Sequence, residues 1–300
     1  MNVFKKVLHV IAILAVLVSC EKGKEMPVEY FPPPPSPSPS PDKETVNPSE
    51  LPCDFNVMTF NVRYPASSDK GEKAWSSRRK AVYAMIKDRK PMIIGVQECY
   101  LSQRADILAN CSDYKAYGVG RDDGKEKGES MSILYDSKKV QLENSGTFWL
   151  SPTPDKPSKG WDAACNRTAT WAIVKIIATG KRFFLVNTHL DHVSSTAREE
   201  GIKLIKNRID ALNTDLLPTI VMGDMNVDGS NPIFNVLGMK NSREEAEVTD
   251  NVYTYGSKYI DHIFYKGLDV VAYETINGNW EGTNYLSDHK PIMSKFNFLK

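Results

Sequence analysis

The chain has 300 residues, with 38 Lys or Arg against 37 Asp or Glu, so its formal net charge at pH 7 is +1. This balance argues against a protein that holds long nucleic acid by charge alone, because such proteins are usually strongly basic. It does not exclude an enzyme that acts on a single phosphate group.

The first 20 residues, MNVFKKVLHVIAILAVLVSC, are typical of a bacterial export signal. Lys5 and Lys6 supply the positive start, and residues 7–18 supply an apolar run that is too short for a good membrane span. The run ends in LVSC and resembles a lipoprotein signal, which implies cleavage before Cys20 and a lipid on its sulfur. We therefore expect a lipoprotein anchored to a membrane of the cell envelope, either periplasmic or surface-exposed. A plain signal peptide or an uncleaved anchor is the alternative.

Residues 21–52 contain FPPPPSPSPSPDKE, and proline this dense predicts an extended linker rather than a helix or a sheet. The remaining residues, 53–300, have the length of a single α/β domain, which we expect to be a monomer without a protein partner. Four cysteines fall in this domain: Cys53, Cys99, Cys111 and Cys165. Export permits disulfides, free thiols are the equally weighted alternative, and the absence of a CxxC pair argues against zinc.

Hydrophobic patterns predict strands that alternate with helices along the domain. Helices are expected at 76–90, capped by Ser76 or Ser77, and at 196–212, with a capping box of Thr196 and Glu199. Strands are expected at 54–62, 92–98, 114–120, 130–137, 168–179, 181–190, 219–224, 258–267 and 292–298. Hairpins mixed with helices indicate an α/β fold with two mostly antiparallel sheets packed face to face and helices outside.

Polar residues stand at the ends of these predicted strands, at Asn61, Glu98, His189, Asp224 with Asn226, Asp261, and Asp288 with His289. Each one alone is readily explained as a turn former or a surface charge. Because packed sheets bring strand ends together, the whole set indicates a cluster of titratable groups in one cleft. Side chains at i and i+2 of a strand point the same way, so Asp224 and Asn226 are expected to face one spot. Their oxygens suit a hard cation such as Mg²⁺.

Six motifs, TFNVR, VQE, NTHLDH, GDMN, YIDHIF and SDHKPI, follow one another in this order between residues 54 and 298. They resemble the endonuclease/exonuclease/phosphatase superfamily, which includes pancreatic deoxyribonuclease, exonuclease III and inositol polyphosphate 5-phosphatases. The segments between the motifs resemble a bacterial lipoprotein branch near the deadenylase-like members. The resemblance implies a four-layered α/β sandwich that hydrolyses a phosphodiester or a phosphomonoester by in-line attack of water.

The resemblance also implies a role for each residue at the strand ends. Glu98 would be the main Mg²⁺ ligand, with Asn61 and Asp288 beside it, and Mn²⁺ is the other candidate metal. The other residues would act on the phosphate: Asp224 and Asn226 position the attacking water and the phosphoryl oxygens, Asp261 orients His289, and His189 and His289 contact the scissile phosphate.

Four residues from less general segments are candidates for substrate binding: Arg167, Glu129, Trp161 and Trp149. Arg167 could clamp a phosphate, Glu129 could be an acid beside the metal or behind its ligands, and the tryptophans could stack a base or a sugar. A surface charge at Arg167 or Glu129 and a core position for the tryptophans are the alternatives. The chain shows no long basic arm and no long hydrophobic hairpin, which favours a small molecule or single-stranded nucleic acid as the phosphoester. The alternative function is a non-catalytic lipoprotein of the same fold that binds a ligand at the cell surface.

Overall fold

The computed structural model describes residues 47–300 of the chain. The predicted export signal, Cys20 and the Pro-rich segment up to residue 46 lie outside the described residues. Within the described part, no helix is long and apolar enough to cross a membrane. The described chain begins with a short 3₁₀ turn, η1 (Pro48–Glu50), after which the Lys295 ammonium donates a hydrogen bond to the Leu51 carbonyl (2.8 Å).

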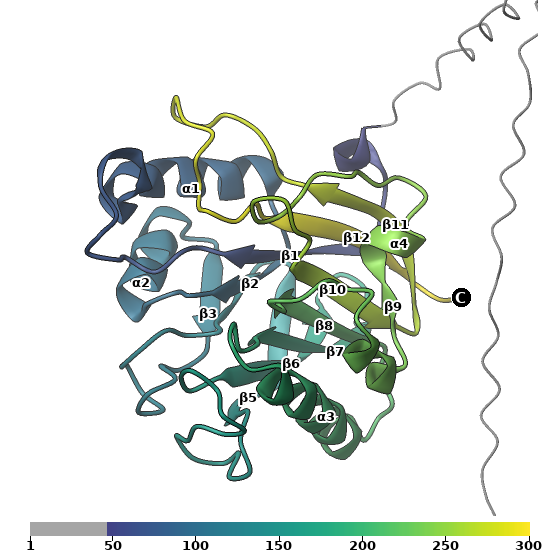
Figure 1. The fold of residues 1–300 in the computed structure, drawn as a ribbon. Helices are drawn as coiled ribbons and strands as arrows, with labels where there is room; N and C mark the ends of the chain where they lie inside the picture. Colours follow the sequence, from purple (N-terminus) through teal and green to yellow (C-terminus); the bar gives the residue numbers. More distant parts are fainter. Residues whose placement is uncertain (1–46) are drawn as a thin grey trace, which may run out of the picture. The chain divides into compact units, whose positions relative to one another are not determined.

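Residues 47–300 form two six-stranded sheets that pack face to face (Figure 1). The strands are β1 (Phe55–Asn61), β2 (Ile93–Gln97), β3 (Tyr114–Tyr117), β4 (Ile133–Asp136), β5 (Val140–Trp149), β6 (Thr168–Ile176), β7 (Arg182–His189), β8 (Thr219–Asp224), β9 (Lys240–Asn241), β10 (Asp261–Lys266), β11 (Leu268–Thr275) and β12 (Ile292–Phe298). The first sheet has the order β11-β12-β1-β2-β4-β3, and the second has the order β5-β6-β7-β8-β10-β9. In each sheet one central pair is parallel, β1 with β2 and β7 with β8, and the other pairs are antiparallel.

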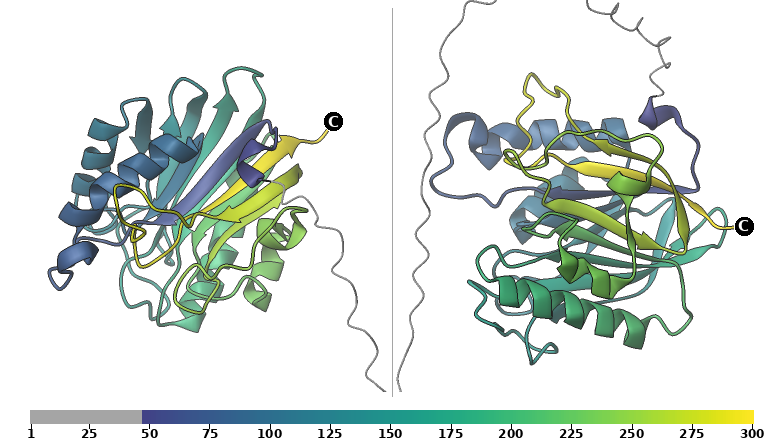
Figure 2. Two further views of the ribbon diagram at one scale, coloured as in Figure 1. Left: turned by 90° about the horizontal axis from the view of Figure 1, so that it is seen from above. Right: turned by 45° about the vertical axis from the view of Figure 1, so that its right-hand side comes forward.

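Helices cover the outer faces of both sheets (Figure 2). The first sheet is covered by α1 (Trp75–Arg89) and α2 (Leu101–Asn110), and the second by α3 (Ser195–Leu212). Three shorter helices lie in connections: η2 (Gly71–Lys73), η3 (Pro232–Leu237) and α4 (Ser242–Glu245). The layers therefore run helix, sheet, sheet, helix, and the expected four-layered α/β sandwich is confirmed.

The alternation of side chains along the central strands explains these layers. Val57 of β1 and Leu185 of β7 point into the space between the sheets, where they belong to one buried cluster. Met58, the next residue of β1, points outward and packs with Met85 of α1. Because both faces of these strands are buried, they read in the sequence as nearly continuous apolar runs.

The beginning of α1 differs from the sequence-based expectation. The helix starts at Trp75 with Ala74 as the N-cap residue, and no side chain caps it, so the predicted cap at Ser76 or Ser77 is wrong. The short turn η2 leads directly into the helix, and the Arg78 guanidinium stacks on the Trp75 ring at 5.0 Å.

The long helix α3 is capped by Ser194, whose hydroxyl accepts a hydrogen bond from the Ala197 N–H (3.0 Å). The predicted capping box of Thr196 and Glu199 is therefore wrong. The elements α2, β5 and β11 were not predicted from the sequence, and neither were the short elements η1, η2, η3, β9 and α4. The cysteines of the domain are all free thiols in the structure.

Candidate active site

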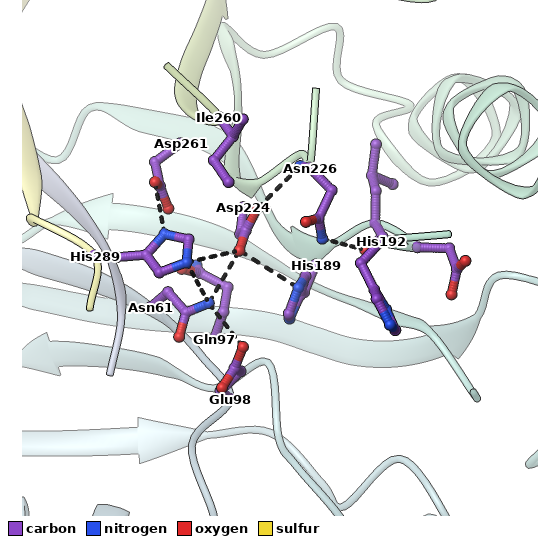
Figure 3. A network of polar contacts seen from close by, with 12 residues as sticks. Asn61, Gln97, Glu98, His189, His192, Asp224, Asn226, Ile260, Asp261 and His289 are labelled. Carbon is purple, nitrogen blue, oxygen red and sulfur yellow. Dashed lines mark hydrogen bonds and ion pairs between the residues drawn. The ribbon is translucent and has the colours of Figure 1, made fainter. Parts of the chain in front are cut away.

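The carboxyl ends of the two parallel strand pairs meet at one side of the sandwich. Asn61 at the end of β1 lies in register with the last residue of β2, and His189 at the end of β7 lies in register with Asp224 at the end of β8. Strand β10 begins at Asp261, directly opposite Asp224. Both sheets thus deliver polar side chains to one point, as Figure 3 shows.

Asn61 joins the two sheets at this point. Its Nδ2 donates to Glu98 Oε1 at 3.1 Å and to Asp224 Oδ2 at 2.9 Å, and its Oδ1 accepts from the Arg63 N–H at 3.0 Å. The second oxygen of Glu98 accepts from the Tyr64 N–H at 3.2 Å. Asn61 is fully buried, so these hydrogen bonds fix both carboxylates relative to each other.

The His289 ring lies between two carboxylates. Its Nδ1 is 2.9 Å from Asp261 Oδ2, and its Nε2 is 3.7 Å from Asp224 Oδ2. Burial disfavours a charged imidazole, but the charges of Asp261 and Asp224 outweigh this effect and raise the pKa of His289 to about 10. Burial and the charge of Asp261 raise the pKa of Asp224 to about 7, although the charged His289 opposes this rise. At neutral pH an imidazolium therefore faces a carboxyl group that titrates in the same range.

His189 also lies next to Asp224, but its ring is neutral, whereas the His289 ring is charged. Its Nε2 is 3.4 Å from Asp224 Oδ2. Burial, together with the positive charges of Arg167 and Arg121, holds the pKa of His189 well below its usual range, so the ring is neutral. Its buried Nδ1 has no hydrogen-bond partner among residues 47–300. A buried polar atom without a partner at a cleft is a position where a ligand can bind.

Glu98, His189, Asp224 and His289 line a cavity of about 390 Å³, whereas Asn61 and Asp261 lie behind its wall. The lining residues are Arg63, Tyr64, Glu98, Arg121, Glu129, Cys165, Arg167, His189, His192, Asp224, Asn226, Tyr255, Ile260, Asp288 and His289. Most of them are charged or polar, and the volume is at the lower end of the range of small-molecule pockets. The cavity therefore suits a small, polar ligand.

Two arginines belong to the wall of this cavity. Arg121 Nη1 lies 2.6 Å from Glu129 Oε2. Arg167 is 4% exposed; its Nε lies 3.3 Å from Asp191 Oδ2, and its Nη2 lies 2.8 Å from His192 Nδ1. Burial raises the pKa of Glu129, and the charge of Arg121 counteracts part of this rise. Each arginine is thus held by a carboxylate in the wall of the cavity that Asp224 also lines.

Three residues of the site have a left-handed backbone. Arg63, Glu98 and Asn226 have φ values of 57°, 54° and 53°. Such conformations cost free energy for residues other than glycine and tend to occur at functional sites. For Asn226 this geometry also corrects an expectation: β8 ends at Asp224, so the two side chains do not share a strand face. Instead the Asn226 N–H donates to Asp224 Oδ1 (2.9 Å). Residues 224–226 therefore form a turn, and Asp224 and Asn226 line the cavity.

A sequence model of the Endonuclease/Exonuclease/phosphatase family matches residues 58–289 of the chain. This chain belongs to that family. Family members are metal-dependent phosphoesterases, and the chain has their fold, with its buried group of acidic residues and histidine at the strand ends.

Solved structures of bacterial family members are similar to the whole described domain. A mannosyl-6-phosphatase of Bacteroides thetaiotaomicron is 32% identical with a TM-score of 0.78, and the match covers 81% of this chain and 100% of that one. A family protein of Bacteroides vulgatus is 35% identical with a TM-score of 0.76, over 82% of this chain and 99% of that one. The catalytic domain of human Nocturnin shares the fold at 18% identity and a TM-score of 0.65, over 82% and 93%.

The family's use of a divalent metal can be tested against the donor groups present. The ligand atoms of Asp224, Asp261 and His289 lie within 4.8 Å of one another. However, a His289 ring held in its charged form has no lone pair for a metal. Glu98 fits better, because its carboxylate accepts two hydrogen bonds and keeps about two of its four lone-pair positions. Asn61 and Asp288 would supply further oxygen atoms, the ligand atoms that Mg²⁺ prefers.

The structure separates the candidates for substrate binding. Arg167 and Glu129 line the cavity, whereas neither Trp149 nor Trp161 is among its lining residues. Trp149 is 5% exposed, and its indole N–H donates to the Arg121 carbonyl at 2.6 Å. Trp149 therefore supports the cavity wall, and this geometry gives no support to stacking against a ligand.

Sequence reasoning missed Arg121 and Tyr255. Tyr255 lies over the His289 ring, with the ring centroids 4.6 Å apart. No motif marks this tyrosine, and only the fold brings it to the cavity. For Arg121 there was a signal in the segment GRDDGKEKGE, residues 120–129. Arg121 near its start and Glu129 at its end flank a tight, glycine-rich turn.

Proposed function

We propose that this protein is a divalent-metal-dependent phosphatase of small phosphomonoesters, with sugar phosphates as the first class to test. The observation that carries the proposal is the meeting of Glu98, Asp224 and His289 in one small polar cavity at the strand ends of a family member. The cavity volume of about 390 Å³ favours a compact substrate. The mannosyl-6-phosphatase that is 32% identical to this chain supports the sugar phosphate class.

The carboxylate of Glu98, with Asn61 and Asp288, would hold the metal. A bound Mg²⁺ neutralises charge on phosphoryl oxygens. Asp288 is already drawn towards this end of the cavity, since Arg63 Nη1 lies 3.7 Å from its Oδ2. Thermal unfolding provides a readout of metal binding that does not depend on activity, because a ligand of the native state stabilises it.

Hydrolysis needs a base for the attacking water and positive charge at the phosphate. Asp224 would accept the proton of the water, because a pKa of about 7 matches a base that works near neutral pH. Asn226 lines the cavity next to it and would orient the water. The oxygen–phosphorus bond to water would form as the ester bond breaks, and the departing alkoxide would take a proton from solvent and leave as an alcohol. His289, kept cationic by Asp261, would stabilise the charge on the phosphoryl group. His189, neutral and with Nδ1 unpaired in the described structure, would bind the same group.

The test is the release of phosphate by the full-length protein with Mg²⁺, Mn²⁺ or EDTA. The substrates are mannose 6-phosphate, inositol phosphate, p-nitrophenyl phosphate, bis(p-nitrophenyl) phosphate and single-stranded DNA and RNA. We expect metal-dependent turnover of the monoesters, lost by at least about a hundredfold in Glu98→Ala but kept in Glu126→Ala, whose side chain is exposed. Turnover that is unchanged in Glu98→Ala sinks the proposal. Metal binding without turnover of any substrate would favour a ligand-binding protein instead.

We also propose that the enzyme is a lipoprotein of the cell envelope, anchored through Cys20. The LVSC sequence after an apolar run and the Pro-rich segment that follows support this proposal. Such a tether of about 3 Å per residue would keep the catalytic domain near the membrane.

A further inference from the structure

The side chains of Arg121 and Glu129 form a fixed pair in the cavity wall. Both come from one tight loop between β3 and β4, in which the Arg121 N–H donates to the Glu129 carbonyl (2.9 Å). The Arg121 carbonyl in turn accepts from Trp149 Nε1 (2.6 Å) and from Asn166 Nδ2 (3.3 Å). Gly120 belongs to the same loop, and a Cβ atom there would lie 2.3 Å from the Lys127 carbonyl oxygen. The loop is therefore closely packed, and it holds the pair in place.

The pair keeps unused hydrogen-bonding capacity. Within residues 47–300, the contact from Arg121 Nη1 to Glu129 Oε2 is the only side-chain hydrogen bond of either residue. A guanidinium has five N–H donors and a carboxylate about four acceptor positions. Glu129 is only 8% exposed, and its Oε1 and Arg121 Nη2 have no hydrogen-bond partner in the described structure, although both residues line the cavity. Buried polar groups are normally paired, so a ligand with donors and acceptors is expected at this wall.

The neighbouring arginine shows a contrasting arrangement. Arg167 donates to Asp191 and contacts His192, and Asp191 is itself held by the N–H groups of Val193 and Ser194 (3.0 and 2.8 Å). Arg167 is therefore tied to two other residues of the protein, whereas the side chains of Arg121 and Glu129 hydrogen-bond only to each other within the described structure. The two residues can offer a donor and an acceptor side by side.

The charge of the pair selects the kind of ligand. Glu129 would repel a second phosphate or a carboxylate, and Glu98 lines the same cavity. A sugar hydroxyl is both a donor and an acceptor, so adjacent hydroxyls can bridge a guanidinium and a carboxylate. We propose that Arg121 and Glu129 form the subsite that binds the hydroxyl groups of an uncharged sugar whose single phosphate lies at Glu98, Asp224 and His289. This inference rests on the proposed function and adds the part of the substrate that is recognised.

The test compares two glutamates of the same loop. Glu129→Gln keeps the size of the side chain but removes the negative charge with which Glu129 would accept hydrogen bonds from sugar hydroxyl groups. Glu126→Gln makes the same change at an exposed position. For each full-length variant, kcat/KM is measured with mannose 6-phosphate and with p-nitrophenyl phosphate, which has no hydroxyl groups. We expect the ratio of the two kcat/KM values to fall about tenfold in Glu129→Gln, through KM, and to stay unchanged in Glu126→Gln.

Arg121→Lys serves as the second variant, because a lysine keeps the charge but loses the planar fork of donors. A ratio that falls about tenfold in both variants supports the subsite. An unchanged ratio in folded Glu129→Gln and Arg121→Lys proteins overturns it, whether or not both activities fall together. If the wild-type protein instead releases no phosphate from either compound with Mg²⁺, the proposed function itself fails, and the subsite fails with it.

Discussion

At the scale of single residues, the site depends on the charge state of His289. The charge and the hydrogen bond of Asp261 make the largest contributions to the raised pKa of this ring, and Asp224 and Asp288 make smaller ones, so Asp261→Asn lowers this pKa towards neutral pH. The ring then loses its proton within the working pH range, and the phosphoryl group loses a cation. We expect kcat to fall about a hundredfold near neutral pH, with a larger loss at pH 8.5 than at pH 6.5. A pH profile of kcat measures this effect.

Asp269→Asn is the matched control, since Asp269 lies on β11 with an exposed side chain. A kcat of Asp261→Asn that falls by the same factor at every pH would contradict the role of Asp261 in charging the ring. It would leave Asp261 with a purely structural function.

A second buried histidine, His262, contributes to stability in acid in addition to His189. His262 is 2% exposed, and burial lowers its pKa, so the folded protein keeps it neutral. Its Nε2 lies 3.1 Å from the carbonyls of Val227 and Tyr259. The unfolded chain takes up a proton near pH 6.5, and the folded chain does so only at lower pH, so stability is full above pH 6.5 and falls below it.

We expect this residue to remove up to about 1.4 kcal/mol of unfolding free energy for each pH unit below pH 6.5. Urea titrations of the wild type and of His262→Gln between pH 7.5 and pH 5 measure it. The curve of the variant should be shallower in acid by that amount. Parallel curves would show that His262 does not titrate in this range.

Sequence reasoning found most of the residues that meet at the site, because strand-end polar residues are visible in the pattern. The reason given for Asn226, a strand face shared with Asp224, was wrong. No sequence pattern shows that β8 ends at Asp224 or that Asn226 has a left-handed backbone. It left Trp149 open between stacking on a ligand and a position in the core, because a tryptophan that faces a cleft and one that lies beneath its wall have the same sequence signal. Such differences are set by tertiary packing.

At the scale of secondary structure, Gly223 decides how closely β7 and β8 pair. Its φ is +150°, and a Cβ atom there would lie 1.9 Å from the Thr188 carbonyl oxygen. Gly223→Ala must therefore push the strands apart, just before His189 and Asp224. We expect a loss of about 3 kcal/mol or more in unfolding free energy, together with loss of activity. Urea denaturation and phosphate release measure the two effects.

Gly180→Ala is the control for backbone strain alone. Gly180 has a φ of +70°, and its Cβ would meet nothing within 4 Å, so the cost should be about 1 kcal/mol with activity retained. Equal costs at the two glycines would mean that the close approach to Thr188 is relieved by a small shift of the chain.

The ends of the helices show the limit of prediction at this scale. Ser194, Ser195 and Thr196 are three adjacent hydroxyl residues, and local sequence does not choose the cap among them. Asp191 makes the choice, because its Oδ1 accepts the N–H groups of Val193 and Ser194 and thereby fixes the entry of the chain. The strands were easier to predict, since burial on both faces produces long apolar runs that do not depend on such distant contacts.

At the scale of the whole molecule, the site exists only when both sheets have closed on each other. Asn61 belongs to the first sheet and Asp224 to the second, and their 2.9 Å hydrogen bond spans the layers. The order of the six motifs predicted this meeting, because it identified the fold and not only single residues. The sequence also predicts where the domain is attached, at a position outside the described residues.

The attachment can be tested in cells. A lipid contributes about 0.8 kcal/mol per buried CH₂ group, so two acyl chains on one cysteine hold a protein firmly on a membrane. Full-length protein from cells grown with radioactive palmitate should carry the label and partition into the detergent phase. The Cys20→Ser variant should lose the label. Cys53→Ser, which changes a thiol of the folded domain, should keep it. Label that persists in Cys20→Ser, or a wild-type protein without label, would contradict the anchor and leave an ordinary export signal or an uncleaved anchor as the explanation of the first 20 residues.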